Sequence, residues 1–487
     1  MDLYVKNNTF WFELENLTRA FFPNEKITVH REFSEIIEPF IYTELGELVT
    51  VRVKIGDFFE EQTAEPADDN AKNELITVRL LYRILVRLCG VELPWGLLTG
   101  VRPIKLFRSI SEKSGGEEAR RRFQNDYFVS GEKTELAALT EKNERKIISL
   151  SSPESFSLYV GVPFCPSRCS YCSFVMSSVE RAEKLMAPYV RLLCEELKVT
   201  AQIASDLGLR LESVYFGGGT PTTLSAEQLN EVLGTVNRCF DMSSCREFTV
   251  EAGRPDTIDT ERLFALKENN VDRISINPQT LSDSVLQAIG RRHTAGQFLD
   301  AFALARKCGF GNINTDLIAG LPTDTLSGFK NSLDTVLELG AECVTVHTLC
   351  MKRAARLTTE GKSLNREEAL LTREMLNYAQ TVLTGQGYIP YYLYRQTRMV
   401  GNLENVGWSK RGYESLYNVF VMDETHTILG CGSGGVTKLK NQETGFLKRI
   451  FNFKYPYEYI DRFEEMLKRK AEIYTFYGSN TVDYSHQ

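Results

Sequence analysis

The sequence lacks the features that mark a membrane or secreted protein. Its most apolar stretch, Leu80 to Leu98, is interrupted by Arg83, Arg87 and Glu92, too early for a helix that spans a bilayer. The first residues contain neither a basic n-region nor an apolar h-region, the two parts of a secretory signal. We therefore expect a cytoplasmic protein with no membrane span.

The sequence also has no excess of positive charge. The formal net charge is −7, which argues against nucleic acid or an anionic membrane as a partner. The 11 cysteines are odd in number and no secretory signal is visible, so a disulfide framework is not expected. What remains is an ordinary globular composition, 43% hydrophobic and 25% charged, over 487 residues, which suggests two or three domains.

Three of the cysteines are closely spaced and form the most informative motif. Cys165, Cys169 and Cys172 follow the pattern C-x3-C-x2-C, directly after the apolar run Leu158 to Phe164, which is typical of a buried strand. A proline after the first cysteine and a tyrosine before the third indicate a tight loop and not a helix face. The spacing therefore predicts that three thiols project from one loop.

The number of thiols indicates which metal centre the loop could hold. Structural zinc is normally closed by four ligands, and the five histidines are all remote from this loop in the sequence. A cubane iron–sulfur cluster held by three thiolates keeps one iron open for a substrate. The motif favours such a cluster, with a zinc site closed by a distant ligand and inert buried thiols as the alternatives.

The N-terminal part of the chain carries no catalytic motif. Short alternating segments at Thr9–Leu14, Lys26–Glu32 and Leu48–Ile55 predict strands of a small antiparallel sheet. Asn70–Cys89 then has one apolar stripe at helical spacing. We expect a separate α+β domain over residues 1–153.

From residue 154 onward the sequence alternates between strand and helix. Six such units in about 200 residues predict a parallel sheet with right-handed crossovers. Six are too few for a closed eight-stranded barrel, so we expect an α/β fold with a partial, TIM-like (β/α)6 barrel over residues 154–355 and a C-terminal helical or mixed domain over 356–487. The expected strands are Ser157–Phe164, Ser213–Phe216, Phe248–Ala252, Arg273–Ile276, Ile313–Ile318 and Cys343–Leu349.

Each expected strand ends in polar or glycine residues, and in such barrels the working residues lie at these carboxyl ends. The second strand leads into Gly217–Pro221, where missing side chains allow a ligand to approach the backbone. The third brings Glu251 and Arg254 to the rim, and the fourth leads to an amide side chain at Gln279. The fifth contains Asp316 in an apolar context, where a carboxylate needs a structural partner such as Arg291, or a ligand.

Together these motifs resemble those of the oxygen-independent coproporphyrinogen III oxidases, a group of radical S-adenosylmethionine (radical SAM) enzymes. The resemblance spans about residues 155–440, and the N-terminal domain with Tyr391–Gln396 is similar to the coproporphyrinogen dehydrogenase (HemZ-type) branch. The segments that carry it are Tyr159–Cys172, Gly217–Thr222, Ser275–Leu281, Gly290–His293, Asp316–Pro322, Gly401–Asn418 and Gly430–Gly435.

The resemblance implies a role for each matching residue. Cys165, Cys169 and Cys172 would hold a [4Fe-4S] cluster whose open iron is chelated by SAM. Gly218, Gly219 and Thr220 would line the methionine part of SAM, and a second SAM is left open. Further SAM contacts would come from Tyr159, Tyr171, Glu251, Gln279, Arg291 and Asp316, with catalytic roles for Tyr159 and Arg291.

The resemblance also implies a reaction. A 5′-deoxyadenosyl radical would remove hydrogen from a propionate of coproporphyrinogen III, and loss of CO2 and one electron would leave a vinyl group. Two rounds would give protoporphyrinogen IX, with reduced flavodoxin or a ferredoxin-type protein as the electron donor. The four carboxylates of the tetrapyrrole need cationic partners, for which the candidates are Arg291, Arg292, Arg353, Arg356, Arg395 and Arg398.

One position departs from the well-characterised oxidases. They carry an extra cysteine two residues after the third cluster cysteine, where this sequence has Phe174. The haem-chaperone branch of the family also has an aromatic residue there. Two alternatives therefore stay open: a haem chaperone or insertase that retains the SAM fold, and another radical SAM reaction on an unknown substrate.

Overall fold

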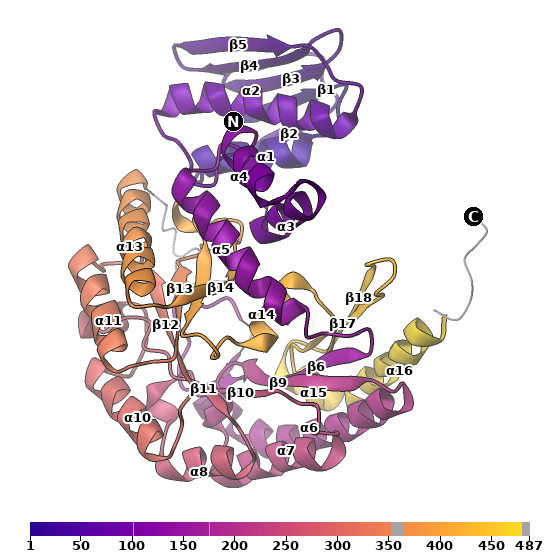
Figure 1. Ribbon diagram of the computed structural model, residues 1–487, viewed down its shortest axis with the longest axis vertical. Coiled ribbons are helices and arrows are strands. Elements are labelled where there is room, and N and C mark those ends of the chain that lie inside the picture. Colours follow the sequence, from indigo (N-terminus) through magenta and orange to yellow (C-terminus); the bar gives the residue numbers. More distant parts are fainter. Residues whose placement is uncertain (101, 175, 352–364, 480–487) are drawn as a thin grey trace. The chain divides into compact units, whose positions relative to one another are not determined.

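The computed structural model describes residues 1–100, 102–174, 176–351 and 365–479, which form two compact units (Figure 1). Unit 1 comprises residues 1–141, 365–373 and 394–404, and unit 2 comprises 142–351, 374–393 and 405–479. The division into domains at 1–153, 154–355 and 356–487 stays a prediction. Two of the arginines proposed for the substrate, Arg353 and Arg356, lie outside the described residues. Within the described ranges, no helix is long and apolar enough to cross a membrane.

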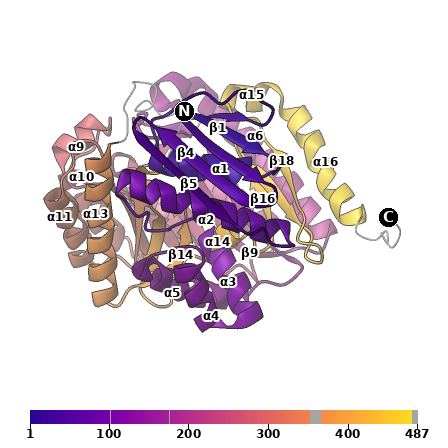
Figure 2. The same cartoon turned by 90° about the horizontal axis from the view of Figure 1, so that it is seen from above.

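Unit 1 is built on a five-stranded sheet with the order β2-β1-β3-β4-β5 (Figure 2). Strand β1 pairs in parallel with β2 and β3, whereas the β3-β4 and β4-β5 pairs are antiparallel. Helix α2 packs on β4 and β5, and α1 packs on α2. The elements are β1 (Asp2–Lys6), α1 (Trp11–Phe21), β2 (Thr28–His30), β3 (Phe40–Leu45), β4 (Val49–Ile55), β5 (Phe58–Ala64), α2 (Asn70–Cys89), α3 (Pro103–Ser114), α4 (Gly116–Asn125) and α5 (Gly131–Ile148).

Two predictions for this region were wrong. The segment Thr9–Leu14, expected to be a strand, leads into helix α1, because Leu14 and Leu17 face the core at helical spacing while Phe12 is 55% exposed. The sheet is mixed and not antiparallel, because α1 returns the chain so that β2 runs parallel to β1. The helix predicted over Asn70–Cys89 is confirmed.

The segment Tyr394–Glu404 belongs to unit 1 and is held there by buried polar contacts. Glu404 accepts a hydrogen bond from Trp95 Nε1 at 2.7 Å and pairs with Lys133 Nζ at 2.8 Å. The Arg395 guanidinium donates to the backbone oxygen of Leu98 and lies over the Trp95 ring. Arg395, one of the arginines considered for the tetrapyrrole, is therefore buried and has its partners within unit 1.

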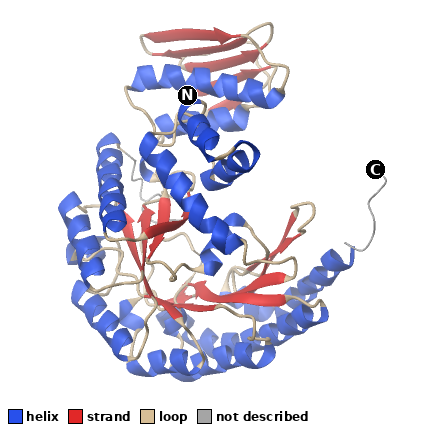
Figure 3. Cartoon of the chain, viewed as in Figure 1, coloured by secondary structure: helices blue, strands red, loops and turns tan. Residues whose placement is uncertain are grey.

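Unit 2 contains the expected parallel barrel. Six strands lie side by side in sequence order, β6-β9-β10-β11-β12-β13, and every neighbouring pair among them is parallel. Helices cover the outer side of this sheet (Figures 1 and 3), so the prediction of six βα units is confirmed. The strands are β6 (Ser155–Val162), β9 (Arg210–Gly218), β10 (Glu247–Glu251), β11 (Arg273–Ser275), β12 (Ile313–Ala319) and β13 (Cys343–Thr348). The helices between them are α6 (Val179–Asp206), α7 (Ala226–Cys239), α8 (Thr260–Glu268), α9 (Asp283–Ala288), α10 (Ala295–Lys307) and α11 (Leu326–Glu338).

Further strands extend the sheet on both sides to eleven. Strand β16 pairs in parallel with β6 and is followed by antiparallel β17 and β18, while β15 pairs antiparallel with β13 and neighbours β14. These elements are β14 (Ile389–Tyr394), β15 (Asn405–Ser409), β16 (Thr427–Cys431), β17 (Val436–Lys440), β18 (Leu447–Phe451), α13 (Arg366–Gly385), α14 (Leu416–Asp423), α15 (Pro456–Asp461) and α16 (Phe463–Ser479). The C-terminal region is mixed, as expected.

A buried carboxylate fixes the loop that follows β16. Glu196 on α6 is fully buried and accepts from the backbone N–H of Gly432 at 2.7 Å and from Tyr459 at 2.6 Å. Its other oxygen accepts from Asn452 at 2.7 Å and pairs with Lys470 at 2.9 Å. With every partner in place, the charge is compensated and the glycine-rich loop is held at the carboxyl end of β6.

Helix α7 begins at a reciprocal cap just after the glycine segment. The Ser225 hydroxyl accepts from the Gln228 backbone N–H at 3.3 Å, and the Gln228 side chain accepts from the Ser225 backbone at 3.0 Å. We expect Ser225→Ala to lower the free energy of unfolding by about 1 kcal/mol, because the half-buried backbone N–H of Gln228 loses its partner. Denaturant titration measures this. Ser225→Asp keeps an acceptor and should lose much less; an equal loss in both variants would contradict the assignment.

Candidate functional site

The three cysteines lie on one loop at the carboxyl end of β6. The loop is closed at its base because strand β7 (Phe164–Cys165) pairs with β8 (Ser177–Ser178). Cys169 is buried, while Cys165 and Cys172 are half-buried, and none of the three is in a disulfide. Ser170 donates its backbone N–H to the oxygen of Ile289 at 2.9 Å, which fixes the middle of the loop.

The thiols suit a metal cluster chemically. Burial raises the pKa of Cys165 to about 11, against a hydrogen bond from Thr220 that lowers it, and burial also raises the pKa of Cys172. A guanidinium nitrogen of Arg254 lies 3.7 Å from the Cys169 sulfur and donates a hydrogen bond to it. Among the described residues, no three His, Cys, Asp or Glu side chains converge on the position of a single metal ion. Three thiols on a fixed loop are the donor set that a larger [4Fe-4S] cluster takes.

The glycine segment after β9 runs directly against the start of this loop. Thr220 donates its backbone N–H to the oxygen of Phe164 at 2.7 Å, and its hydroxyl lies 3.4 Å from the Cys165 sulfur. A Cβ added at Gly219 would lie 2.5 Å from the Phe164 oxygen, and Gly218 has a φ of +108°. Only glycine fits both positions, so the segment packs closely against the cysteine loop while Gly218 and Gly219 stay half-buried.

Aromatic rings and a carboxylate occupy the mouth of the barrel. Tyr159 stacks against Tyr215 and Tyr417 with ring centroids 6.4 and 6.3 Å apart. The Tyr215 hydroxyl donates to Glu251 Oε1 at 2.5 Å. Burial raises the pKa of Glu251 to about 7, with the nearby charge of Asp316 adding to the effect and the Tyr215 hydrogen bond opposing it. Glu251 can therefore exchange a proton near neutral pH.

We expect Glu251→Gln to remove a pH-dependent loss of stability. Because the pKa of Glu251 is raised from 4.5 to about 7 on folding, stability present below pH 4.5 is lost as the pH rises through 7. Glutamine never ionises and can still accept from Tyr215. The variant should therefore gain about 2–3 kcal/mol relative to the wild type between pH 5 and pH 8. Denaturant titration without SAM at the two pH values measures the gain. The same difference in free energy of unfolding between variant and wild type at both pH values would contradict the prediction.

Asp316 is paired with a histidine and not with Arg291, the partner suggested from the sequence. Asn314 donates to Asp316 Oδ1 at 2.8 Å, and His347 Nε2 lies 3.6 Å from Oδ2. Burial alone would raise the pKa of Asp316, but the hydrogen bond and charge of His347 outweigh it and lower the pKa. Gln279 lies alongside, with its backbone N–H donating to the backbone carbonyl oxygen of Asp316 at 3.0 Å and an unusual φ of +69°.

Arg291 connects the cysteine loop to the end of β11. Its guanidinium donates to the backbone oxygen of Asn277 at 2.6 Å and to the Tyr171 hydroxyl at 3.3 Å. Arg291 also lies beside the Cys169 thiol. The twelve side chains and glycines that the sequence pointed to are thus all in unit 2, in one group around the cysteine loop and another at the barrel mouth.

Three residues of this site were missed from the sequence: Tyr215, His347 and Tyr417. Tyr215 lies two residues before Gly217 in β9. Because alternate residues of a strand point to the same face, Tyr215 could have been predicted to share the face of the glycine segment. His347 lies one residue before the carboxyl end of β13, where working residues of such a barrel are expected. Tyr417 is on α14, and nothing local in the sequence indicates its stacking.

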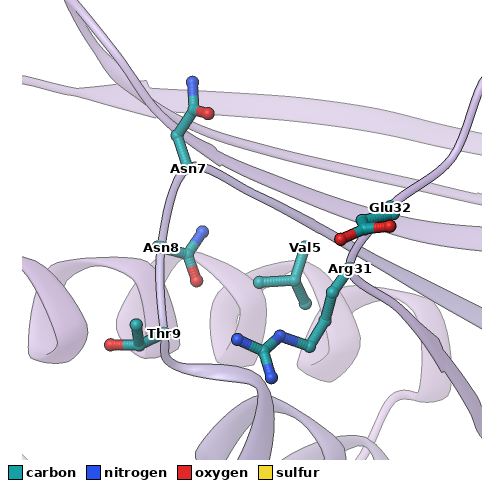
Figure 4. A pocket seen from close by; sticks show the side chains of 6 residues that line it. All are labelled: Val5, Asn7, Asn8, Thr9, Arg31 and Glu32. Carbon is teal, nitrogen blue, oxygen red and sulfur yellow. The ribbon is translucent and has the colours of Figure 1, made fainter.

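Two further candidates for the tetrapyrrole are Arg398 and Arg292. Arg398 belongs to unit 1, and Arg292 is exposed and paired with Glu180 at 2.8 Å. Unit 1 also contains a cavity of about 660 Å³ at the ends of β1 and β2 (Figure 4). Its lining residues are Val5, Asn7, Asn8, Thr9, Arg31 and Glu32, none of which was predicted as a site residue.

Comparisons with known proteins bear on this site. The sequence profile of the radical SAM superfamily matches residues 159–336. The chain is 37% identical over 424 residues to the oxygen-independent coproporphyrinogen-III oxidase-like protein HemZ of Bacillus subtilis, a match that covers 85% of this chain and 83% of that protein. It is 39% identical over 284 residues to the heme chaperone HemW of the same organism, covering 57% of this chain and 70% of that protein.

A solved structure is similar as well. The coproporphyrinogen III oxidase HemN from Escherichia coli, described as a radical SAM enzyme, aligns with a TM-score of 0.52 at 19% identity. The alignment covers 66% of this chain and 72% of that chain, and at this identity it bears on the fold alone. It confirms the fold class expected for the barrel.

Proposed function

The chain belongs to the radical SAM family of oxygen-independent coproporphyrinogen III oxidase-like proteins, in its HemZ-type branch, and we propose that it decarboxylates coproporphyrinogen III without oxygen. Members of the radical SAM family use a [4Fe-4S] cluster and SAM, as the motifs predicted. When both are bound, reductive cleavage of SAM supplies a 5′-deoxyadenosyl radical.

In this proposal the chain's own residues bind and orient. The thiolates of Cys165, Cys169 and Cys172 would hold the cluster. The backbone at Gly218, Gly219 and Thr220 would line the methionine part of SAM, because it lies beside the cysteine loop. The remaining SAM contacts would come from Tyr159, Tyr171, Glu251, Gln279, Arg291 and Asp316.

The barrel mouth supplies groups suited to the polar parts of SAM. Ionised Asp316, held by His347, can accept hydrogen bonds from hydroxyl groups, and Glu251 can do so in either protonation state. The stacked rings of Tyr159 and Tyr215 offer an apolar wall that excludes water. Arg291 is fixed by Asn277 and Tyr171, so its proposed catalytic role is to position the groups around Cys169.

The proposed reaction turns a propionate into a vinyl group. One hydrogen atom leaves the side chain, the carboxylate leaves as CO2, and one electron passes to an acceptor. Two rounds convert coproporphyrinogen III into protoporphyrinogen IX, with a reduced flavodoxin or ferredoxin-type protein as the electron donor. The observation that carries the proposal is the cysteine loop seated against the glycine segment in a chain 37% identical to an oxidase-like protein over 83% of its length.

A second candidate function is that of a haem chaperone. It is favoured by the 39% identity to HemW and by Phe174, which is 64% exposed where the well-characterised oxidases have a cysteine. The anaerobic product assay separates the two. The reconstituted protein is incubated with SAM, dithionite and coproporphyrinogen III, and CO2, 5′-deoxyadenosine and protoporphyrinogen IX are measured. The proposal expects two CO2 for each product molecule; haem binding without turnover would favour the chaperone.

A further inference from the structure

A buried arginine after strand β10 is aimed at the cysteine loop. Arg254 is 3% exposed and follows the carboxyl end of β10. One guanidinium nitrogen donates to the Cys169 sulfur at 3.7 Å and to the backbone oxygen of Ser167 at 3.3 Å. The other terminal nitrogen donates to the Ser167 hydroxyl at 3.1 Å. Its position after the strand places this arginine at the rim of the barrel.

The opposite side of the guanidinium is fixed by a carboxylate. Asp256 accepts from Arg254 Nε at 3.1 Å and from a terminal nitrogen at 3.2 Å, a two-point contact that sets the plane of the group. Since the side chain is anchored on both sides, its positive charge has a fixed position relative to the Cys169 sulfur.

The charges around this pair are of both signs. Asp256 offsets part of the charge on Arg254, and Arg291 adds a second guanidinium beside Cys169. His293 is buried nearby, and burial together with the two arginines lowers its pKa to about 3, so it is uncharged at neutral pH. Exposed Arg292 is paired with Glu180. The two guanidinium groups and Asp256 therefore leave a net positive charge among the side chains around this sulfur.

We propose that Arg254 is a positioning residue that raises the reduction potential of the cluster by stabilising negative charge on the Cys169 sulfur. The proposal rests on the proposed function in one respect, that Cys169 is a cluster ligand. Reduction adds one electron from the donor and no proton, so the reduced cluster carries one more negative charge than the oxidised cluster. A fixed positive charge and an N–H···S hydrogen bond stabilise the reduced cluster more than the oxidised cluster. Hydrogen bonds to the sulfurs are among the factors that set the reduction potentials of iron–sulfur clusters.

A merely structural role makes a different prediction. If Arg254 only clamps the loop through Ser167, its loss would lower iron retention or thermal stability and leave the potential of the remaining clusters unchanged. An electrostatic role changes the potential at full iron content.

The test is a potentiometric titration of the reconstituted holoenzyme with dithionite, followed by the electron paramagnetic resonance signal of the reduced cluster. For Arg254→Gln we expect a more negative midpoint, with the ratio of reduced to oxidised cluster about tenfold lower at a fixed potential, or about 59 mV for one electron. Arg254→Lys keeps the charge and should recover part of the shift. The matched control is Arg306→Gln, which removes an arginine that also binds a carboxylate and backbone oxygens, at the far end of α10.

Asp256→Asn should shift the midpoint potential in the opposite direction to Arg254→Gln. This variant tests the proposal even if Arg254→Gln fails to hold iron. Removing the carboxylate leaves the charge on Arg254 uncompensated, so the midpoint should become more positive. An unchanged midpoint in Arg254→Gln at full iron content, a shift of equal size in Arg306→Gln, or an unchanged or more negative midpoint in Asp256→Asn would each overturn the proposal. Full iron in Cys169→Ala would instead overturn the ligand assignment, which keeps the two failures distinguishable.

Discussion

Cys169→Ala is expected to lose nearly all of the cluster on anaerobic reconstitution. The wild-type chain should bind about four irons, the content of one cubane cluster. Cys169 is the buried middle ligand of the three, and its loop has no spare thiol to replace it, because the neighbouring side chains are Arg168 and Ser170. A cluster left with two thiolates is exposed and labile. Iron and sulfide assays with the visible absorption spectrum measure the loss.

The matched control is Cys239→Ala, which removes an exposed thiol at the last residue of α7. It should bind iron like the wild type. Retention of about four irons by Cys169→Ala would remove the basis for the cluster assignment. Equal loss in both variants would show that reconstitution, and not this loop, limits the iron content.

The barrel could be predicted closely because its strands are short apolar runs separated by amphipathic helices. Strand β12, for example, was expected at Ile313–Ile318 and is found at Ile313–Ala319. The backbone N–H and C=O groups of a buried parallel strand form their hydrogen bonds mainly with neighbouring strands. The local apolar pattern is therefore enough to predict where such a strand lies. The six-unit partial barrel followed from the count of such runs.

Unit 1 and the C-terminal strands were harder, because their signals are not local. In α1 the apolar residues alternate over the first turn, which mimics a strand, and only burial of Leu14 and Leu17 against α2 decides for helix. Strand β16 extends the parallel sheet beside β6, although more than 260 residues separate them in the chain. A sequence pattern does not reveal which distant strand completes an edge.

In the candidate site, too, features set by local sequence could be predicted and features set by distant contacts could not. Residue types at strand ends pointed to Glu251, Gln279 and Asp316, because the carboxyl ends of parallel strands share one edge. Their partners could not be predicted, since each depends on which strand lies next to which. The pairing of Asp316 with His347 follows from the register of β12 and β13, in which Ile318 is opposite His347.

The second large effect is expected at Gly219, where a single methyl group should abolish tight SAM binding. The added Cβ of Gly219→Ala would lie 2.5 Å from the oxygen and 2.9 Å from the carbonyl carbon and nitrogen of Phe164. These are backbone atoms, so either the glycine segment or the start of the cysteine loop has to move. Both are proposed to bind SAM, and we expect its affinity to fall on the order of a hundredfold, about 2.8 kcal/mol.

Anaerobic calorimetric titration of the reconstituted protein with SAM measures this loss, and iron content is measured on the same sample. Gly311→Ala is the matched control, because Gly311 precedes β12 in the same unit and an added Cβ there meets nothing within 4 Å. It should bind SAM like the wild type. Normal affinity in Gly219→Ala at full iron content would mean that SAM does not contact this segment. A parallel loss of iron and affinity would instead mean that the methyl group acts by displacing the cysteine loop, as its closeness to Phe164 also allows.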